Sequence, residues 1–209
     1  MYKHFFKKVF DFLIASILLI LFFPLLVLIS LTLILVNKGT PFFIQKRPGI
    51  NEKPFLLIKF KTMIDVSEFN ENYKNFDDGK LDIVRITKLG RFLRATSIDE
   101  LPELINVLMG QMSLIGPRPL LLEYLNIYSD RHKRRHDVLP GITGLAQVRG
   151  RNSLSWKNKL DLDIKYIDQL SFLNDIKILF LTFMTVFKIK QVNKSKDETM
   201  SKLYEGYEI

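Results

Sequence analysis

A long uncharged apolar run, from Phe12 to Val36, constrains what this chain can fold into more than any other feature. About 20 consecutive apolar residues are enough for a helix to cross the hydrocarbon layer of a bilayer, and this run is longer. It also exceeds the apolar region of roughly 7 to 15 residues found in a signal peptide, and no small-x-small cleavage pattern follows it. We therefore expect a membrane helix that stays on the mature protein.

The residues around this run indicate how it meets the membrane. Basic residues flank both of its ends: Lys3, Lys7 and Lys8 before it, and Lys38, Lys46 and Arg47 after it. Because basic flanks tend to stay in the cytoplasm, both ends are expected on that side. Pro24, near the middle of the run, lacks an amide hydrogen and would kink a helix. Residues 1–38 are therefore predicted to form a re-entrant membrane helix hairpin, with a tilted spanning helix that tolerates its proline as the alternative.

Residues 39–190 are predicted to form one domain at the membrane interface, because a chain of 209 residues leaves little room for a second domain. Two segments rich in aromatic and aliphatic residues, Pro41–Arg47 and Pro54–Thr62, predict a short β-hairpin. A polar loop is expected at 64–82, and helical patterns follow at 87–95, 97–110, 120–138, 155–168 and 172–190. The predicted fold class is thus α+β and mainly helical, with a polar C-terminal tail at 191–209.

The last helical segment, 172–190, has a broad apolar surface, a narrow polar strip and a basic end. This pattern is typical of an interfacial amphipathic helix that lies at the lipid surface. It is equally typical of a buried core helix, because the apolar arc is wide. Both interpretations stay open at this point.

The overall charge narrows the choice of partners. Lys and Arg total 31 against 22 Asp and Glu, which gives a net charge of +9. Such a chain favours partners that carry phosphate: nucleic acid, anionic lipid headgroups or a phosphorylated substrate. The chain has no Cys, which excludes disulfide scaffolds, thiolate zinc sites and cysteine nucleophiles.

The segment Ser97-Ile98-Asp99-Glu100 is the main candidate for chemistry and has two interpretations. As a capping box, Ser97 would cap a helix and Glu100 would reach back to it, with Asp99 at the positive end of the helix dipole. As a phosphate site, one carboxylate would attack phosphorus and the other would hold a magnesium ion. The apolar positions are expected to pack inward and leave Asp99, Glu103 and Asn106 on another face. These apolar positions are Ile98, Leu101, Leu104, Ile105 and Leu108.

Basic residues surround the acidic pair and favour the second interpretation: Lys59, Lys61, Arg85, Lys88, Arg91 and Arg94 before it, and Arg118 after it. A carboxylate that attacks an anionic phosphoryl group needs that charge neutralised, and guanidinium groups and a metal ion do this. The prolines on both sides of Arg118 restrict its loop and reduce the entropy lost in positioning it. Taken alone, each basic residue would be a surface or lipid headgroup contact.

Two weaker patterns are also present. His132 and His136 stand four residues apart and could face a metal, but no third ligand is evident, and their segment is interpreted as a solvated basic face. The glycines at 141–144 and 150 form a predicted loop that could approach a nucleotide or sugar, although such glycines are equally often turns.

Taken together, these segments resemble the monotopic phosphoglycosyl transferases of the bacterial sugar transferase family, in their minimal catalytic form. The resemblance covers most of the chain and rests on blocks in the same order. They are the Pro-interrupted N-terminal run, Lys59–Met63, Thr87–Arg94, Ser97–Pro102, Met112–Pro119 and Pro140–Gly144, the last leading into Gly150-Arg151-Asn152. The chain departs from the commonest pattern at Gln111, often acidic, and at Leu145, often Trp, which leaves loop contacts and substrate preference open.

The resemblance implies an enzyme at the cytoplasmic face of the bacterial inner membrane. It would transfer a sugar 1-phosphate from a UDP-sugar to undecaprenyl phosphate, a polyprenyl phosphate, and release UMP as a first step of glycan assembly. Asp99 would be the nucleophile that carries the covalent sugar phosphate, and Glu100 would bind magnesium. The substrate-binding cations would be Lys59, Arg94, Arg118 and Arg151. The implied partners are the donor, the acceptor and membrane lipid, with no nucleic acid, and a homodimer is compatible with the sequence, which does not set the oligomeric state.

Two competing interpretations belong to other classes of protein. A non-catalytic membrane scaffold would bind anionic lipids through its basic surface and use Ser97–Glu100 only as a helix cap. Asp99→Asn would then leave function intact and cost at most about 1 to 2 kcal/mol of stability. A membrane-tethered nucleic-acid binder is supported by net charge alone, because no recognition motif is present.

Overall fold

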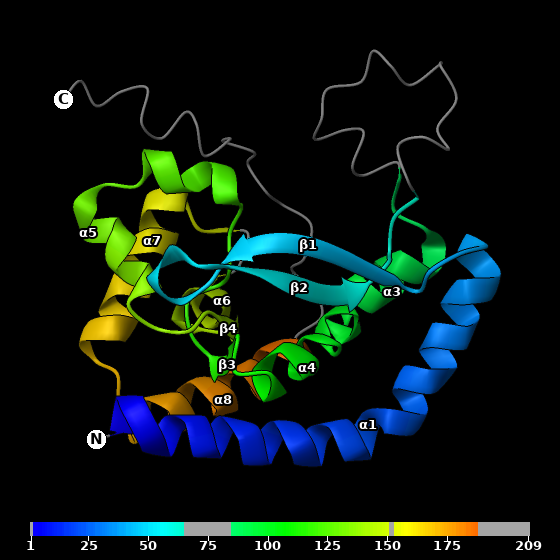
Figure 1. Ribbon diagram of the computed structural model, residues 1–209, viewed down its shortest axis with the longest axis horizontal. Helices are drawn as coiled ribbons and strands as arrows, with labels where there is room; N and C mark the ends of the chain where they lie inside the picture. The colour runs from blue at the N-terminus through cyan, green and yellow to red at the C-terminus, as the bar shows by residue number, and fades with distance from the viewer. Residues whose placement is uncertain (1, 65–84, 151–152, 188–209) are drawn as a thin grey trace.

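The computed structural model describes residues 2–64, 85–150 and 153–187 (Figure 1). The predicted polar loop from residue 65 onward and the predicted tail at 191–209 lie outside these residues. Within them the protein is mainly helical with two small two-stranded sheets, and this confirms the predicted mixture of helices with a β-hairpin.

The apolar run forms a single helix, α1 (Lys7–Asn37), which follows a π-helical turn, η1 (Tyr2–Phe6). It is the one helix in the described part of the chain that is long and apolar enough to cross a membrane. Helix α1 continues through Pro24 and bends near its middle, so that its first half runs along one side of the domain and its second half rises beside it (Figure 1). A proline in a helix interior is a common cause of such a bend. Where the sequence predicted a helix hairpin, the structure therefore has one bent helix.

The first half of α1 is tied to the domain by buried polar contacts. Lys7 Nζ lies 2.7 Å from Asp175 Oδ2, and Ser113 Oγ donates a hydrogen bond to Asp11 at 2.7 Å. Ala15, one turn further along, belongs to the main apolar core. Because buried charges are tolerated only when paired, these contacts fix the N-terminal end of α1.

The second half of α1 is tied to another part of the same domain. Leu33 is fully buried in an apolar cluster with Phe60 and Leu93. Beyond it, Asn37 Nδ2 donates a hydrogen bond to the Lys61 carbonyl at 3.1 Å. Both ends of α1 therefore contact one domain, although a straight helix of 31 residues would hold its ends about 46 Å apart.

The predicted β-hairpin is confirmed. Strand β1 (Phe42–Pro48) pairs antiparallel with β2 (Pro54–Phe60), and the turn between them contains a short helix, η2 (Ile50–Glu52). Residues paired across the strands share a face. Phe55 and Leu57 of β2 are buried, so their face is the inner one, and Lys59 lies on it as well.

A second sheet was not predicted from the sequence. Strands β3 (Ser113–Ile115) and β4 (Gly141–Thr143) pair in parallel inside the domain. The backbones approach so closely that a Cβ on Gly141 would overlap the Gly116 nitrogen. The segment expected to be only a Gly-rich loop therefore contains β4 and a short helix, α6 (Leu145–Arg149).

Four of the predicted helical segments are confirmed: α3 (Lys88–Ala95), α4 (Glu103–Leu108), α7 (Trp156–Asp168) and α8 (Phe172–Phe187). The single helix expected at 120–138 is wrong. That segment forms η6 (Leu122–Ile127), α5 (Asp130–Lys133) and η7 (Arg134–His136). The break occurs because Tyr128 is extended and the Ser129 side chain accepts a hydrogen bond from His132 N, which starts a new helix.

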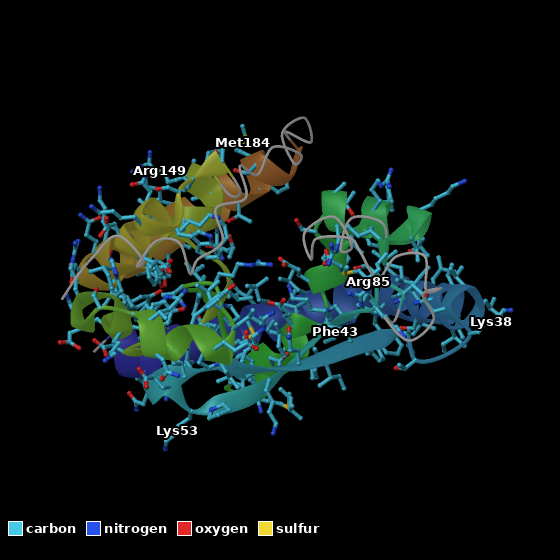
Figure 2. All side chains as sticks on the ribbon, turned by 90° about the horizontal axis from the view of Figure 1, so that it is seen from above. Lys38, Phe43, Lys53, Arg85, Arg149 and Met184 are labelled. Atoms are coloured by element: carbon cyan, nitrogen blue, oxygen red, sulfur yellow. The ribbon has the colours of Figure 1, made fainter. Side chains whose placement is uncertain are left out.

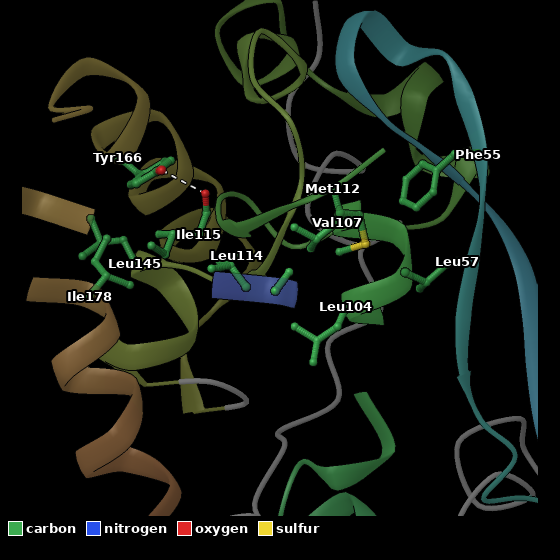
Figure 3. Packing of buried hydrophobic residues seen from close by; sticks show 11 residues of the cluster. Phe55, Leu57, Leu104, Val107, Met112, Leu114, Ile115, Leu145, Tyr166 and Ile178 are labelled. Carbon is green, nitrogen blue, oxygen red and sulfur yellow. Dashed lines mark hydrogen bonds between the residues drawn. The ribbon is translucent and has the colours of Figure 1, made fainter. Parts of the chain in front are cut away.

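The main core lies between α4, α8, β2 and β3 (Figure 3). Leu104 and Val107 of α4 pack near Leu114 of β3, and Ile178 brings α8 onto the same cluster. The Tyr166 hydroxyl donates a hydrogen bond to the Ile115 carbonyl at 3.0 Å, as Figure 3 shows, which ties α7 to β3.

Helix α8 has one buried face and one exposed apolar face. Asp175 and Ile178 are fully buried, whereas Leu173 is 79% exposed and Phe180 and Phe183 are 63% and 62% exposed. Helix α8 therefore has the buried face of a core helix as well as the exposed apolar face expected of a helix at the lipid surface. Exposed apolar side chains in a row are typical of a surface that meets an apolar partner or lipid.

Candidate active site

The acidic pair lies in a tight turn between α3 and α4. Ser97 adopts a left-handed backbone conformation with φ of 58°, and a single 3-10 turn, η5 (Ile98–Glu100), carries Asp99 and Glu100. The Ser97 side chain makes no capping hydrogen bond, so the predicted capping box is wrong. Left-handed conformations are costly for residues other than glycine, and they cluster at functional sites.

Glu100 is held between two of the predicted cations. Its Oε1 atom accepts hydrogen bonds from Lys59 Nζ and Arg118 Nη2, both at 2.7 Å. Lys59 also lies 2.9 Å from Glu103 Oε1. Three segments far apart in the sequence, β2, η5 and the loop after β3, therefore meet at Glu100. Charge-assisted hydrogen bonds of this kind are short and strong.

Helix α4 turns its polar side toward this cluster, contrary to part of the prediction. Asp99, Glu103 and Asn106 are all buried, while the apolar Ile105 is 37% exposed. The inward packing predicted for the apolar positions holds for Leu104 and is wrong for Ile105. The reason is that Glu103 finds a buried counter-charge in Lys59, and periodicity along the sequence does not reveal such a partner.

Asn106 fixes the strand that carries Lys59. Its side chain accepts a hydrogen bond from Ile58 N at 3.1 Å and donates one to the Leu56 carbonyl at 2.6 Å. These bonds satisfy the open edge of β2 in place of a third strand. The register of Lys59 against Glu100 is thereby set by an amide that is fully buried.

Asp99, unlike Glu100, is not bound by a cation among the described residues. Among the residues that the structure describes, its carboxylate has no ion pair and no hydrogen bond to a side chain. It is nevertheless 9% exposed, and burial, together with the negative charge of Glu100, raises its pKa to about 6. Lys59, Arg94 and Arg118 act in the opposite direction. A poorly solvated carboxylate that is still ionised at pH 7 is suited to attack an electrophile.

The two glutamates have opposite pKa shifts. Burial opposes ionisation of Glu100, but Arg118 and Lys59 outweigh it and lower its pKa. Burial and the charge of Glu100 raise the pKa of Glu103. Glu100 is therefore a fixed negative charge at the centre of the cluster, and Glu103 shares Lys59 with it.

The loop that carries Arg118 is held by a buried ion pair that the sequence did not single out. Arg135 Nη2 donates to the Arg118 carbonyl at 2.6 Å and to Asp163 Oδ2 at 2.8 Å. Its Nη1 atom also donates to the Tyr128 hydroxyl at 3.3 Å. The segment containing Arg135, His132 and His136, interpreted as a solvated basic face, thus has these three side chains buried.

The remaining predicted cations have different positions. Arg94 Nε donates to Thr62 Oγ1 at 3.0 Å, which holds it beside β2 and within electrostatic range of Asp99. Arg151 lies outside the described residues. The structure therefore brings together Asp99, Glu100, Lys59, Arg94 and Arg118, and it adds Glu103 and Arg135.

The donor set agrees with a magnesium ion held mainly by its substrate. No group of three or more His, Asp or Glu side chains gathers for a metal within the described ranges. Magnesium is usually bound by one or two carboxylates plus substrate phosphates, with several waters retained. Both cations bind Glu100 through Oε1, and Oε2 has no partner among the described residues, so this oxygen fits such a role.

Fold and site together define a domain with a cluster of carboxylates and cations at its centre, joined to a long apolar helix. A model of the bacterial sugar transferase family matches residues 2–189, and the chain belongs to this family of enzymes. An uncharacterized sugar transferase, EpsL, of Bacillus subtilis is 45% identical over 194 residues, which is 92% of this chain and 93% of the relative.

Relatives with a named reaction are more distant. A UDP-glucose:undecaprenyl-phosphate glucose-1-phosphate transferase of Caulobacter vibrioides is 39% identical, over 84% of this chain and 67% of the relative. A protein of the same name from Klebsiella pneumoniae is 37% identical over 91% of this chain, but the match spans only 41% of that relative. The predicted family is thus confirmed.

Proposed function

We propose that this enzyme transfers a sugar 1-phosphate from a UDP-sugar to undecaprenyl phosphate through a covalent intermediate on Asp99. The observation that carries the proposal is the contrast within the acidic pair: Glu100 is clamped by two cations, and Asp99, beside it, is buried but unclamped. The names of the relatives support this donor and acceptor.

The reaction has two displacements at one phosphorus. An Asp99 oxygen attacks the phosphorus next to the sugar, the bond from that phosphorus to the bridging oxygen breaks, and UMP leaves with the bridging oxygen. A phosphate oxygen of undecaprenyl phosphate then attacks the same phosphorus and restores the Asp99 carboxylate. Splitting the transfer in this way lets donor and acceptor react in turn.

The cations and Glu100 have separate tasks in this scheme. Lys59 and Arg118 hold Glu100 in place and are available to donate to phosphate oxygens of the donor. Glu100 Oε2 would hold magnesium, which when bound neutralises the charge of the diphosphate. Asp99 is thereby directed at an electrophile whose negative charge is balanced on several sides.

The contacts of α1 support a proposed position at the membrane. Its two ends pack on one domain, through Lys7 with Asp175 and through Leu33 with Phe60, which supports entry and exit on the same side of the membrane. We place the domain at the cytoplasmic face of the bacterial inner membrane, with the exposed apolar face of α8 in the lipid interface. Such an arrangement holds Asp99 where a lipid phosphate and a soluble nucleotide sugar meet.

UMP release tests the reaction directly. Purified protein in nanodiscs, with magnesium, undecaprenyl phosphate and a panel of UDP-sugars, is expected to release UMP with one or more donors. Asp99→Asn is expected to reduce this release at least 10³-fold, because the amide is not a nucleophile. Asp130→Asn is the matched control, since the Asp130 side chain is exposed and pairs with Lys133 at the surface. Full UMP release by Asp99→Asn would refute the proposed nucleophile.

A further inference from the structure

Arg47 lies on the inner face of the β-hairpin, nearer the turn than Lys59. It pairs with Phe55 across the strands, and Gln45 pairs with Leu57. Phe55 and Leu57 are buried, so Arg47 shares their face with Lys59. Figure 2 shows the direction of the hairpin: Phe43 lies toward Lys38 at the end of α1, and Lys53 lies at the opposite end.

The Arg47 guanidinium is only partly satisfied. Its Nη2 donates to Gln45 Oε1 at 2.6 Å, but Nε is buried and has no hydrogen-bond partner among the described residues. Leaving a buried donor on a charged group unpaired is costly. An anionic ligand at this position would remove that cost.

Arg47 lies beside the Arg118 loop. The next residues, Pro48 and Gly49, border the same narrow gap as Pro117, Arg118 and Pro119. Burial, and next the positive charge of Arg118, lower the pKa of Arg47. Two guanidinium groups are thus held within range of each other's charge.

Lys159 lies one turn before Asp163 in α7, and Asp163 shares Arg135 with the carbonyl of Arg118. Lys159 Nζ lies 4.4 Å from the centre of the Trp156 ring, and Trp156 packs edge-on with Tyr124 at 6.0 Å. Burial and Arg118 also lower the pKa of Lys159. Within the described residues neither Arg47 nor Lys159 makes an ion pair with a carboxylate.

Arg118 lies next to all three groups: it donates to Glu100, its loop borders Pro48 and Gly49, and Arg135 ties its carbonyl to α7. The charges of Lys59, Arg94 and Arg118 all act to lower the pKa of Asp99. Of these three cations, Arg118 also lowers the pKa of Arg47 and that of Lys159. In phosphoryl transfer the attacking and leaving oxygens are roughly in line, on opposite sides of phosphorus. A leaving group that departs from Asp99 past Arg118 would therefore meet Arg47 and Lys159.

We propose that Arg47 and Lys159 form a second anion subsite, beyond Arg118 from Asp99, which binds the phosphate of the departing nucleoside monophosphate. The inference rests on the proposed function and assigns a location to its leaving group. The leaving group gains one negative charge as the bridging bond breaks, so cations at this position stabilise it as the reaction proceeds.

Competition by UMP and by uridine tests the subsite. Transfer of labelled sugar phosphate to lipid is measured in nanodiscs with increasing concentrations of either compound. Arg47→Gln and Lys159→Gln are each expected to raise the inhibition constant of UMP tenfold or more. The inhibition constant of uridine, which has no phosphate, is expected to change less than twofold. Arg47→Lys is expected to restore part of the affinity for UMP.

Lys46→Gln and Lys157→Gln are the matched controls, because each removes one positive charge from an exposed neighbour in the same strand or helix. Unchanged inhibition by UMP in both test variants would overturn the subsite. An increase in the KM for undecaprenyl phosphate, with UMP inhibition unchanged, would assign the cations to the acceptor and also overturn it. Failure of the native protein to release UMP from any donor would instead refute the proposed function.

Discussion

At the scale of residues, three neighbouring carboxyl groups differ because their surroundings differ. Glu100 is ionised by two cations that touch it, Glu103 shares one of them from a deeply buried position, and Asp99 touches neither. The group that is held least is therefore the one free to form a bond. Its reactivity depends on buried side chains that fix the cations, Asn106 beside Lys59 and Arg135 beside Arg118.

The Arg135–Asp163 pair is expected to position Arg118 as well as to stabilise the domain. Arg135→Met leaves Asp163 as an unpaired buried charge and is expected to cost about 3 to 5 kcal/mol of stability. Arg135→Met with Asp163→Leu removes both charges, so most of this stability should return. Donor turnover should nevertheless stay at least tenfold low, because the Arg118 carbonyl has lost its donor. Thermal unfolding and UMP release measure the two effects, and full recovery of activity in the double variant would refute the positioning role.

His136 is expected to make the stability depend on pH. Burial, and next the charge of Arg135, lower its pKa from 6.5 to about 4. Between these values the unfolded chain binds more protons than the folded one, so stability is complete above pH 6.5 and falls as the pH drops toward 4. The limiting loss is roughly 3 kcal/mol. The difference in melting temperature between the native protein and His136→Gln should be largest above pH 6.5 and should shrink as the pH falls toward 4. A difference that does not change with pH would contradict this assignment.

At the scale of elements, helix α3 sits against the end of β2 because residue 90 has no side chain. A Cβ on Gly90 would overlap the Thr62 carbonyl oxygen, and Thr62 Oγ1 is the atom that accepts from Arg94. Gly90→Ala is therefore expected to displace α3, to cost about 1 to 3 kcal/mol and to reduce activity. Gly39→Ala is the control, because its nearest atom would be 3.7 Å away. Equal melting temperatures for the two variants would argue against this close packing.

The elements that sequence predicts well are those with a strong local pattern. The hairpin, α3, α7 and α8 have alternating or helical patterns with recognisable caps, such as Thr87 and Ser155. Strands β3 and β4 are three residues each and pair across a long segment, so no local pattern marks them. The break in 120–138 depends on Ser129, whose side chain starts a new helix. A helical pattern judged over the whole segment does not reveal this start.

The part of the site that sequence predicts consists of charged residues that stand in recognisable sequence blocks. Asp99, Glu100, Lys59 and Arg118 were identified from the sequence, and the structure places them in contact or within electrostatic range. Glu103 and Arg47 were assigned no role, because the burial of a charged residue depends on a partner distant in sequence. The left-handed Ser97 has no signal in the sequence either, since serine is an ordinary cap residue.

At the scale of the whole molecule, the bend in α1 lets one domain hold both ends of an apolar helix. Single cysteines at Lys8 and Lys38 can be labelled without interference, because the chain has no Cys. In intact cells both are expected to resist a membrane-impermeant maleimide, and both should react after permeabilisation. Pro24→Ala should straighten the helix and expose one cysteine in part of the population, whereas Leu28→Ala should not. Cysteines on opposite sides in the native background would contradict the re-entrant position.

Trapping the intermediate tests the central proposal most directly. The protein in nanodiscs is mixed with magnesium and a UDP-sugar accepted in the UMP assay, without acceptor lipid, and quenched in acid. Intact mass should rise by one sugar phosphate, peptide mapping should place the addition on Asp99, and undecaprenyl phosphate added before the quench should remove it. UMP release with no adduct on Asp99, or an adduct that persists in Asp99→Asn, would contradict the account.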